Sequence, residues 1–310
     1  MNKVLITDDV HPIMIKEFQS MNFEVDYFPN ITYAETEKII AEYSGIIVNT
    51  KIRVDKNLID GGIQLKFIGR VGSGMDHIDV KYAKEKNIGV FSSPEGNANA
   101  VAEHALGMLL CLLNNISRAD AEIRNGIWKR EENRGVEISG KTIGIIGFGN
   151  TGSAFAKKLS GFECNILAFD KYKSGFGNTY VKEVDYNRLL DQSDIISFHV
   201  PLTIETKFMV NKVMIESTKK PFYLMNTSRG GVVKTIELID GLNSGKILGA
   251  ALDVFENEKY YELKKDEKIL FDTLSSMRNV VMTPHIAGWT FESKVKLTKI
   301  LMEKIKFFLK

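Results

Sequence analysis

Two patterns of apolar and polar positions alternate along the chain: short runs rich in Val and Ile, and longer stretches with helical periodicity. This alternation is typical of parallel sheets built from strand-helix-strand units, so the predicted fold class is α/β. Two successive series of strands predict two doubly wound sheets. The first series covers residues 4–7, 24–27, 45–48, 66–69 and 89–91, and the second covers residues 142–146, 165–169, 195–198, 222–225, 249–252 and 280–282.

Two helical stretches lie outside these series. Residues 99–125 carry apolar residues at helical spacing and stop at Gly126, which predicts one long helix between two domains. Residues 291–308 predict a last helix, left over once the second sheet is complete, and we expect it to return to the first domain. A length of 310 residues also favours two domains.

Composition and charge exclude several classes of protein. The net charge is +2, with basic and acidic residues interleaved, whereas nucleic-acid binding needs a clustered basic face. The chain starts at once with a strand-like run, and its longest apolar stretch, residues 105–113, is far short of the ~20 residues that span a membrane. Cys111 and Cys164 lie in apolar segments and indicate reduced thiols, with no metal framework. We therefore expect a cytoplasmic protein without nucleic-acid or membrane partners.

A glycine-rich turn indicates the cofactor. The segment T-I-G-I-I-G-F-G-N-T-G is a strand that runs into Gly147, Gly149 and Gly152 and then into a helix. These glycines permit the tight turn, the approach of a pyrophosphate and close packing of helix on strand. The next strand ends in Asp170, where a carboxylate accepts hydrogen bonds from ribose hydroxyls and repels a 2′-phosphate. The order of strand, turn, helix, strand and acid predicts NAD, favoured over NADP.

Three polar residues follow apolar strand ends and could carry the chemistry. His285 lies in M-T-P-H-I-A-G, Arg229 in M-N-T-S-R-G-G, and an acid, Glu258 or Glu256, in L-D-V-F-E-N-E. Parallel sheets bind ligands at this edge. Oxidation of a secondary alcohol needs a base for the hydroxyl proton, which suits an imidazole, and a cation for the neighbouring carboxylate, which suits a guanidinium. A carboxylate beside the imidazole would support its charged form.

Across essentially the whole chain the sequence resembles the D-isomer-specific 2-hydroxyacid dehydrogenase family. The resemblance rests on V-G-S-G-M-D-H-I-D, G-F-G-N-T-G, S-F-H-V-P-L-T, N-T-S-R-G-G-V-V, G-A-A-L-D-V-F-E-N-E and T-P-H-I-A. It implies a Rossmann NAD-binding domain (residues 99–286) inserted in a discontinuous, flavodoxin-like substrate domain (residues 1–98 and 287–310). It also implies a small 2-hydroxy or 2-oxo acid as substrate, a cleft that closes over both ligands, and a homodimer formed through the interdomain helix region.

The same resemblance assigns residues to roles. Arg229 would hold the substrate's carboxylate and carbonyl oxygen, His285 would exchange the proton, and Glu258 would pair with His285. The implied cofactor-binding residues are Gly147, Phe148, Gly149, Asn150, Thr151, Gly152, Asp170, His199, Pro201, Thr227 and Asp253. The implied substrate-binding residues are Arg70, Val71, Gly72, Ser73, Gly74 and Arg130, and no metal is expected.

Three functions are open, and the first of them, a D-3-phosphoglycerate dehydrogenase, is the one we favour. Arg70 and Arg130 resemble the phosphoglycerate dehydrogenase branch, in a short form without a domain after Lys310, and would bind a phosphate. Asn49-Thr50 and Lys259 depart from that branch, which leaves lactate, glyoxylate and hydroxypyruvate reductases as alternatives within the family. Relatives of this fold also include NAD-sensing modules that bind proteins in transcription, and fold alone does not separate them from enzymes.

Overall fold

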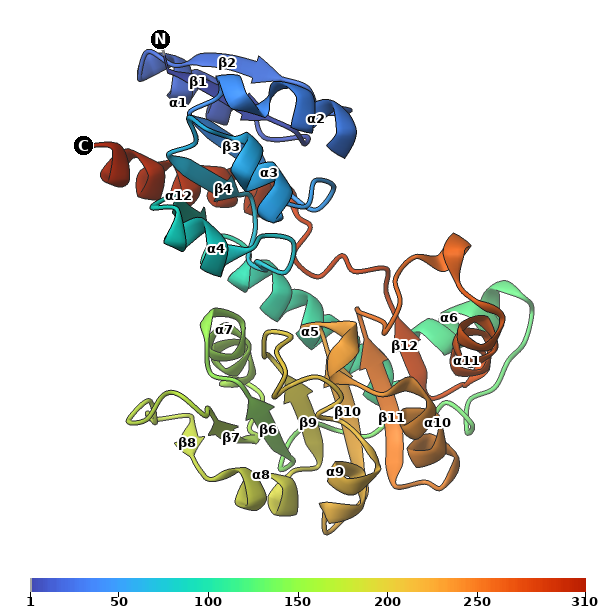
Figure 1. Cartoon of the computed structure of the whole chain (residues 1–310). Coiled ribbons are helices and arrows are strands. Elements are labelled where there is room, and N and C mark those ends of the chain that lie inside the picture. The colour runs from blue at the N-terminus through green and yellow to red at the C-terminus, as the bar shows by residue number, and fades with distance from the viewer. Residues whose placement is uncertain (1) are drawn as a thin grey trace. The chain divides into compact units, whose positions relative to one another are not determined.

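The computed structural model describes residues 2–310, which divide into two compact units (Figure 1). Unit 1 contains the residues up to Ala98 together with Trp289–Lys310, and unit 2 contains Asn99–Gly288. The second boundary lies two residues later than the sequence analysis put it. The N–H of Ala287 donates to Oδ2 of Asp253 at 2.8 Å, and this bond holds the segment to unit 2.

Unit 1 is built on a parallel sheet. Among residues 2–310 this sheet has five strands in the order β2-β1-β3-β4-β5, which is the flavodoxin-like order. The strands are β1 (Lys3–Ile6), β2 (Glu24–Tyr27), β3 (Gly45–Val48), β4 (Phe67–Arg70) and β5 (Gly89–Ser92). The helices are α1 (Ile13–Ser20), α2 (Tyr33–Ile39), η1 (Ile40–Glu42), α3 (Lys56–Gly61), α4 (Val80–Glu85) and α12 (Phe291–Leu309).

Helix α12 comes from the far end of the chain and completes the core of unit 1. In Figure 1 this red helix lies among the blue elements, and it packs against α1, β4 and β5. Its Leu301 and Ile305 are fully buried in one cluster with Phe67 and Ile47. A Cβ at Gly69 of β4 would lie 2.6 Å from the side chain of Ile47 and 3.1 Å from that of Ile305. The glycine therefore lets the helix approach the strand.

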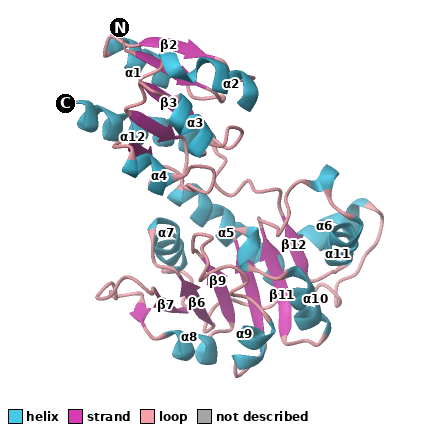
Figure 2. Ribbon diagram, in the orientation of Figure 1, coloured by secondary structure: helices cyan, strands magenta, loops and turns pink. Residues whose placement is uncertain are grey.

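Unit 2 is built on a larger parallel sheet (Figure 2). In the described chain it has seven strands in the order β12-β11-β10-β9-β6-β7-β8, and the order reverses between β6 and β9 as in Rossmann folds. The strands are β6 (Thr142–Ile146), β7 (Asn165–Phe169), β8 (Lys182–Glu183), β9 (Ile195–Phe198), β10 (Phe222–Asn226), β11 (Ile247–Leu252) and β12 (Val280–Met282). The helices are α5 (Ala98–Leu113), α6 (Ile116–Arg124), α7 (Asn150–Leu159), α8 (Tyr186–Gln192), α9 (Lys212–Ser217), η2 (Gly230–Val232), α10 (Thr235–Asn243), η3 (Tyr260–Glu262) and α11 (Lys265–Ser276).

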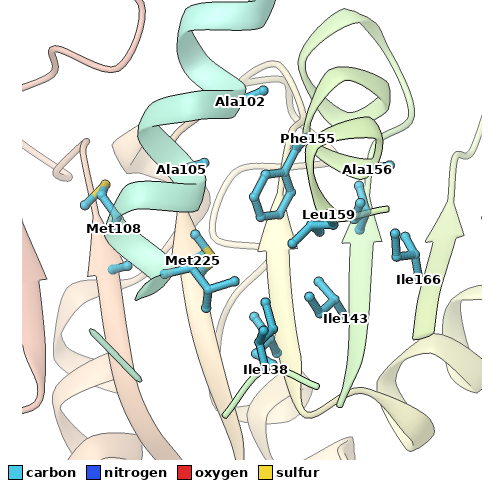
Figure 3. Packing of buried hydrophobic residues seen from close by; sticks show 14 of the residues in the cluster. Ala102, Ala105, Met108, Ile138, Ile143, Phe155, Ala156, Leu159, Ile166 and Met225 are labelled. Carbon is cyan, nitrogen blue, oxygen red and sulfur yellow. The ribbon is translucent and has the colours of Figure 1, made fainter. Parts of the chain in front are cut away.

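Buried apolar side chains hold α5 and α7 on this sheet (Figure 3). Phe155 and Leu159 of α7 are fully buried in the same cluster as Ile143 of β6. Ala105 of α5 joins them from the neighbouring helix, and Met225 comes from β10. This packing places the first turn of α7 at the carboxyl end of β6, where the glycine turn lies. The predicted fold class, two doubly wound parallel-sheet domains of the α/β type, is confirmed.

The expected single helix over residues 99–125 is wrong, because the structure breaks it in two. Asn115 adopts a left-handed backbone conformation (φ +55°), and α5 ends before it while α6 begins after it. Asparagine tolerates this conformation better than most residues. Within residues 2–310 no single helix is long and apolar enough to cross a membrane. Helices α5 and α6 together pass that test on length and composition only, with a 64° bend between them.

Candidate functional site

The glycine turn after β6 has the shape that a dinucleotide needs. Gly147 has a φ of +92°, and a Cβ there would lie 2.4 Å from the carbonyl oxygen of His199. A Cβ at Gly152 would lie 2.0 Å from the carbonyl oxygen of Gly147, so only glycine permits this approach of helix and turn. A Cβ at Gly149, in contrast, would meet no described atom within 4 Å, which leaves open space beside the turn. The three glycines thus permit a tight turn and leave room for a dinucleotide to approach the backbone.

Helix α7 begins at the same turn and offers its N-terminal N–H groups. Gly149 is its N-cap, and Asn150 and Thr151 are its first two residues. The first N–H groups of a helix have no partner within the helix and bind anions such as phosphates. The open space at Gly149 therefore adjoins a positively polarised helix end, and these residues fit the pyrophosphate of a dinucleotide.

Asp170, directly after β7, is held by the backbone around it. Its Oδ2 atom accepts a hydrogen bond from the N–H of Phe148 at 2.8 Å, and its Oδ1 atom accepts one from the N–H of Tyr172 at 2.9 Å. Each oxygen keeps a second lone pair for a further donor. The carboxylate is thereby fixed beside the glycine turn, where the ribose of a bound dinucleotide would offer its hydroxyls.

Three further predicted cofactor residues follow β9 and β10. His199 is buried, its Nε2 atom lies 2.9 Å from Oγ of Ser197, and burial lowers the pKa of the imidazole to about 4. Pro201 is exposed just beyond it. Thr227 is buried, and its hydroxyl has no hydrogen-bond partner within residues 2–310. Because a buried hydroxyl without a partner is costly, Thr227 fits a site that a ligand completes.

The centre of the site is a hydrogen-bonded pair. Nδ1 of His285 lies 2.7 Å from Oε2 of Glu258, and the two side chains are 48% and 39% exposed. With Nδ1–H donating to the carboxylate, Nε2 is the ring atom that can exchange a proton with a substrate. The hydrogen bond to Glu258 raises the pKa of His285; burial and Arg229 oppose that shift, and the charges of Glu258 and Asp253 add to it.

Glu256, the alternative acid, binds a different part of the domain. Its Oε2 atom accepts a hydrogen bond from the N–H of Thr235 at 3.0 Å, at the first residue of α10. Of the two acids left open by the sequence, the structure brings Glu258 to His285.

Arg229 is placed by the residues on either side of it. The side chain of Asn226, fully buried at the end of β10, donates to the carbonyl oxygen of Arg229 at 2.9 Å and accepts from the N–H of Ser228 at 3.1 Å. A Cβ at Gly230 would lie 1.6 Å from the carbonyl oxygen of Phe255, so the loop of Arg229 lies directly against the loop that leads to Glu258. The positive charge of Arg229 lowers the pKa of His285, against the effect of Glu258.

Asp253 organises the segment that carries His285. Its carboxylate is buried and accepts hydrogen bonds from the Thr283 hydroxyl at 2.5 Å and from the N–H groups of Ile286 and Ala287 at 2.9 and 2.8 Å. The N–H of His285 donates to the carbonyl oxygen of Asp253 at 2.8 Å, and His285 has a left-handed backbone (φ +56°). Such strain persists only where the surroundings hold it. Asp253 therefore positions the imidazole.

Sequence reasoning missed three residues of this support. His104 of α5 places its Nε2 atom 3.1 Å from the Thr283 hydroxyl, which extends the network of Asp253. Asn226 was also missed. Its place at the end of an apolar strand is similar to the signal that identified His285, but its contacts are visible only in the structure. Thr283, two residues before His285, carried no recognisable sequence signal.

The predicted substrate residues of unit 1 lie at the end of β4. Arg70 is partly buried, and its NH1 group donates to the carbonyl oxygen of Val71 at 3.2 Å. Gly72 has a φ of +145°, and Ser73 donates to Oδ1 of Asn97 at 2.7 Å. Gly74 follows in the same loop. Arg130 belongs to unit 2 and is exposed in the segment after α6.

Comparison with known proteins identifies the family. The family model described as D-isomer specific 2-hydroxyacid dehydrogenase, NAD binding domain, matches residues 106–287. The chain is 35% identical to D-3-phosphoglycerate dehydrogenase of Archaeoglobus fulgidus over 305 residues, which are 98% of this chain and 56% of that protein. It is 40% identical to hydroxypyruvate reductase of Thermotoga maritima over 271 residues, 87% of this chain and 86% of that one.

A solved structure shows the same fold over the whole chain. The crystal structure of D-lactate dehydrogenase from Aquifex aeolicus, complexed with NAD and lactic acid, matches with a TM-score of 0.86 and 28% identity, covering 99% of this chain and 95% of that one. The chain spans about half the length of the Archaeoglobus relative. Its unit 2 is an NAD-binding domain, and the chain belongs to the D-isomer specific 2-hydroxyacid dehydrogenase family.

Proposed function

We propose that the protein is an NAD-dependent dehydrogenase that interconverts a D-2-hydroxy acid and the corresponding 2-oxo acid. The observation that carries the proposal is the 2.7 Å pair of His285 and Glu258 on the domain that holds the glycine turn and Asp170. In the same domain the loop of Arg229 packs against the loop that leads to Glu258. Bound NAD supplies the hydride acceptor, or the donor in reverse. Gly149, the first turn of α7, Asp170 and Thr227 would hold it.

The side chains divide the remaining chemistry between them. Nε2 of His285 would take the hydroxyl proton during oxidation and return it during reduction. Glu258 keeps the imidazole oriented and stabilises its protonated form, since it holds Nδ1. Arg229 would bind the carboxylate of the substrate and polarise the oxygen at its second carbon, because a guanidinium binds two oxygens side by side.

For the substrate we propose 3-phosphoglycerate, converted to 3-phosphohydroxypyruvate as in serine biosynthesis. The relative in Archaeoglobus fulgidus bears the name of that enzyme, and Arg70 supplies a cation at the end of β4. Val71, Gly72, Ser73 and Gly74 would offer backbone donors to the carboxylate, and Arg130 a second cation. The relative in Thermotoga maritima is a hydroxypyruvate reductase, so the experiment must compare both substrates.

The decisive experiment measures NADH oxidation with a panel of 2-oxo acids that includes 3-phosphohydroxypyruvate, hydroxypyruvate, glyoxylate and pyruvate. The phosphate proposal predicts that Arg70→Ala raises KM for 3-phosphohydroxypyruvate about tenfold, the loss of one charge-assisted contact. It predicts no change for Lys66→Ala, since Lys66 is exposed just before β4. An unchanged KM in Arg70→Ala would refute the phosphate assignment. No turnover on any acid, with tight NADH binding, would favour an NAD-sensing module.

We also propose a cytoplasmic homodimer. Ile116, Ile123, Ile127 and Trp128 of α6 and the segment after it are exposed apolar residues, and Trp128 is 83% exposed in the described chain. Apolar side chains gathered on one segment are typical of an interface between subunits. Sedimentation equilibrium of the whole chain should give twice the mass of 34.9 kDa, and Trp128→Glu should weaken the dimer.

A further inference from the structure

Two lysines follow the carboxylate that should select NAD. The segment after β7 reads Asp170-Lys171-Tyr172-Lys173. A carboxylate at this place repels a 2′-phosphate, whereas nearby cations accommodate one. On local charge alone, the two lysines would cancel the discrimination that Asp170 provides. The structure shows which groups these two lysines bind.

Glu205 binds both Lys171 and Tyr172. Nζ of Lys171 lies 2.6 Å from Oε1 of Glu205, and the Tyr172 hydroxyl donates to Oε2 at 2.5 Å. Lys171 also lies 5.6 Å from the centre of the Tyr172 ring. Both carboxylate oxygens of Glu205 are thus occupied by the two residues that follow Asp170. Lys173 has a different partner, since its Nζ donates to the carbonyl oxygen of Phe148 at 3.3 Å.

A turn after β9 that is closed by side-chain hydrogen bonds carries Glu205. The N–H of Thr203 donates to Oγ1 of Thr206 at 2.8 Å, and the Thr206 hydroxyl donates to the carbonyl oxygen of Pro201 at 2.6 Å. In the sheet, β6 lies between β7 and β9. The pair of Lys171 and Glu205 therefore connects the loops on either side of β6, whose end carries the glycine turn.

The charges of this cluster balance. Asp170 and Glu205 carry two negative charges, and Lys171 and Lys173 carry two positive ones. The hydrogen bond to Glu205 raises the pKa of Lys171, and the hydrogen bonds from Lys171 and Tyr172 lower the pKa of Glu205, so both groups of the pair stay charged at neutral pH. Without Glu205 the cluster would carry a net positive charge beside the ribose site. A 2′-phosphate would then meet an ammonium with no carboxylate partner.

We propose that Glu205 is a second specificity-determining residue for the cofactor, which acts with Asp170 to exclude a 2′-phosphorylated dinucleotide by holding Lys171. The proposal rests on the NAD-binding domain and is independent of the reaction proposed above. It assigns the discrimination against NADPH to two carboxylates from two different strand ends.

Direct binding tests the proposal. NADH and NADPH are titrated into the whole chain, and their dissociation constants are measured from the fluorescence of the reduced nicotinamide. The variants are Glu205→Gln, Lys171→Met and the combination of both. The control is Glu216→Gln, which neutralises an exposed carboxylate on α9 that lies 3.8 Å from Lys212.

The expected result is a change in preference. Lys171 and Glu205 are 57% and 49% exposed, and exposed charge pairs contribute little, so Glu205→Gln should tighten NADPH about fivefold and leave NADH within about twofold. The gain should vanish in the combined variant and fall as salt is raised. Equal changes for both nucleotides, or a gain that persists without Lys171, would overturn the proposal. Because catalysis is not measured, failure of the proposed reaction leaves this test intact.

Discussion

Gly230 and Gly231 allow a matched test of how closely the two loops of the site pack. A Cβ at Gly230 would lie 1.6 Å from the carbonyl oxygen of Phe255, and neither a Cβ nor a backbone oxygen can rotate away. A Cβ at Gly231 would lie 3.2 Å from the end of the Leu202 side chain, which can move. We therefore predict that Gly230→Ala disrupts the site and that Gly231→Ala does not.

The magnitude follows from the distances. Carbon and carbonyl oxygen approach to about 3.3 Å at the closest, so Gly230→Ala must separate the two loops by roughly 1.7 Å. Overpacking costs about 1–3 kcal/mol, and an unyielding backbone contact belongs at the upper end. For a domain of the size of unit 2, about 3 kcal/mol lowers Tm by about 6–12 °C. A misplacement of about 1 Å between Arg229 and Glu258 would also lower kcat/KM by about 100-fold.

Urea unfolding followed by circular dichroism, together with kcat/KM for the best 2-oxo acid, measures both effects. The free energy of unfolding of Gly231→Ala should stay within about 0.5 kcal/mol of that of the parent chain. If Gly230→Ala matched its neighbour in stability and in kcat/KM, the loops would not be in contact, and our account of how Arg229 and Glu258 are brought together would be wrong.

Two further predictions concern His285 and its support. Since Glu258 raises the pKa of His285, Glu258→Gln should lower that pKa. Reduction needs the protonated imidazole and oxidation the neutral one. As the pH is raised, the variant should therefore lose reduction and gain oxidation at a lower pH than the parent chain does, as pH profiles of kcat/KM would show. A profile that does not move would exclude Glu258 as the partner. Asp253→Asn should cost about 3 kcal/mol in urea unfolding, because an amide group would face the N–H of Ala287 or Ile286, whereas exposed Asp240→Asn should cost less than about 0.5 kcal/mol. Equal losses in the two variants would argue against a supporting role for Asp253.

The architecture could be predicted because each of its signals is local. Parallel strands buried on both faces are continuous apolar runs, and the glycine turn with Asp170 lies within one strand-helix-strand unit. The break at Asn115 was not predictable from periodicity, since apolar residues continue on both sides of it and only the backbone conformation ends the helix. The two-residue strand β8 is too short to show an alternating pattern.

The site could be predicted only in part. His285, Arg229 and Asp253 follow strand ends, so the sheet topology brings them to one edge. The residues alone left Glu256 and Glu258 as alternatives, because both lie in an irregular loop where sequence spacing does not set direction, and only the family resemblance implied Glu258. Hydrogen bonds decide it, since Glu256 accepts from Thr235 and Glu258 from His285. The link from Glu205 to Lys171 joins residues 34 positions apart and had no sequence signal.

The place of α12 in unit 1 has a consequence for synthesis on the ribosome. Phe67 and Ile47 share their buried cluster with Leu301 and Ile305, which are translated more than 200 residues later. At about 5–20 residues per second, the nascent first half exposes this apolar surface for roughly 10–50 s. Unit 2, which is contiguous, can fold within that interval. We expect chaperones to bind the waiting N-terminal strands, and truncation before α12 to leave an aggregating chain.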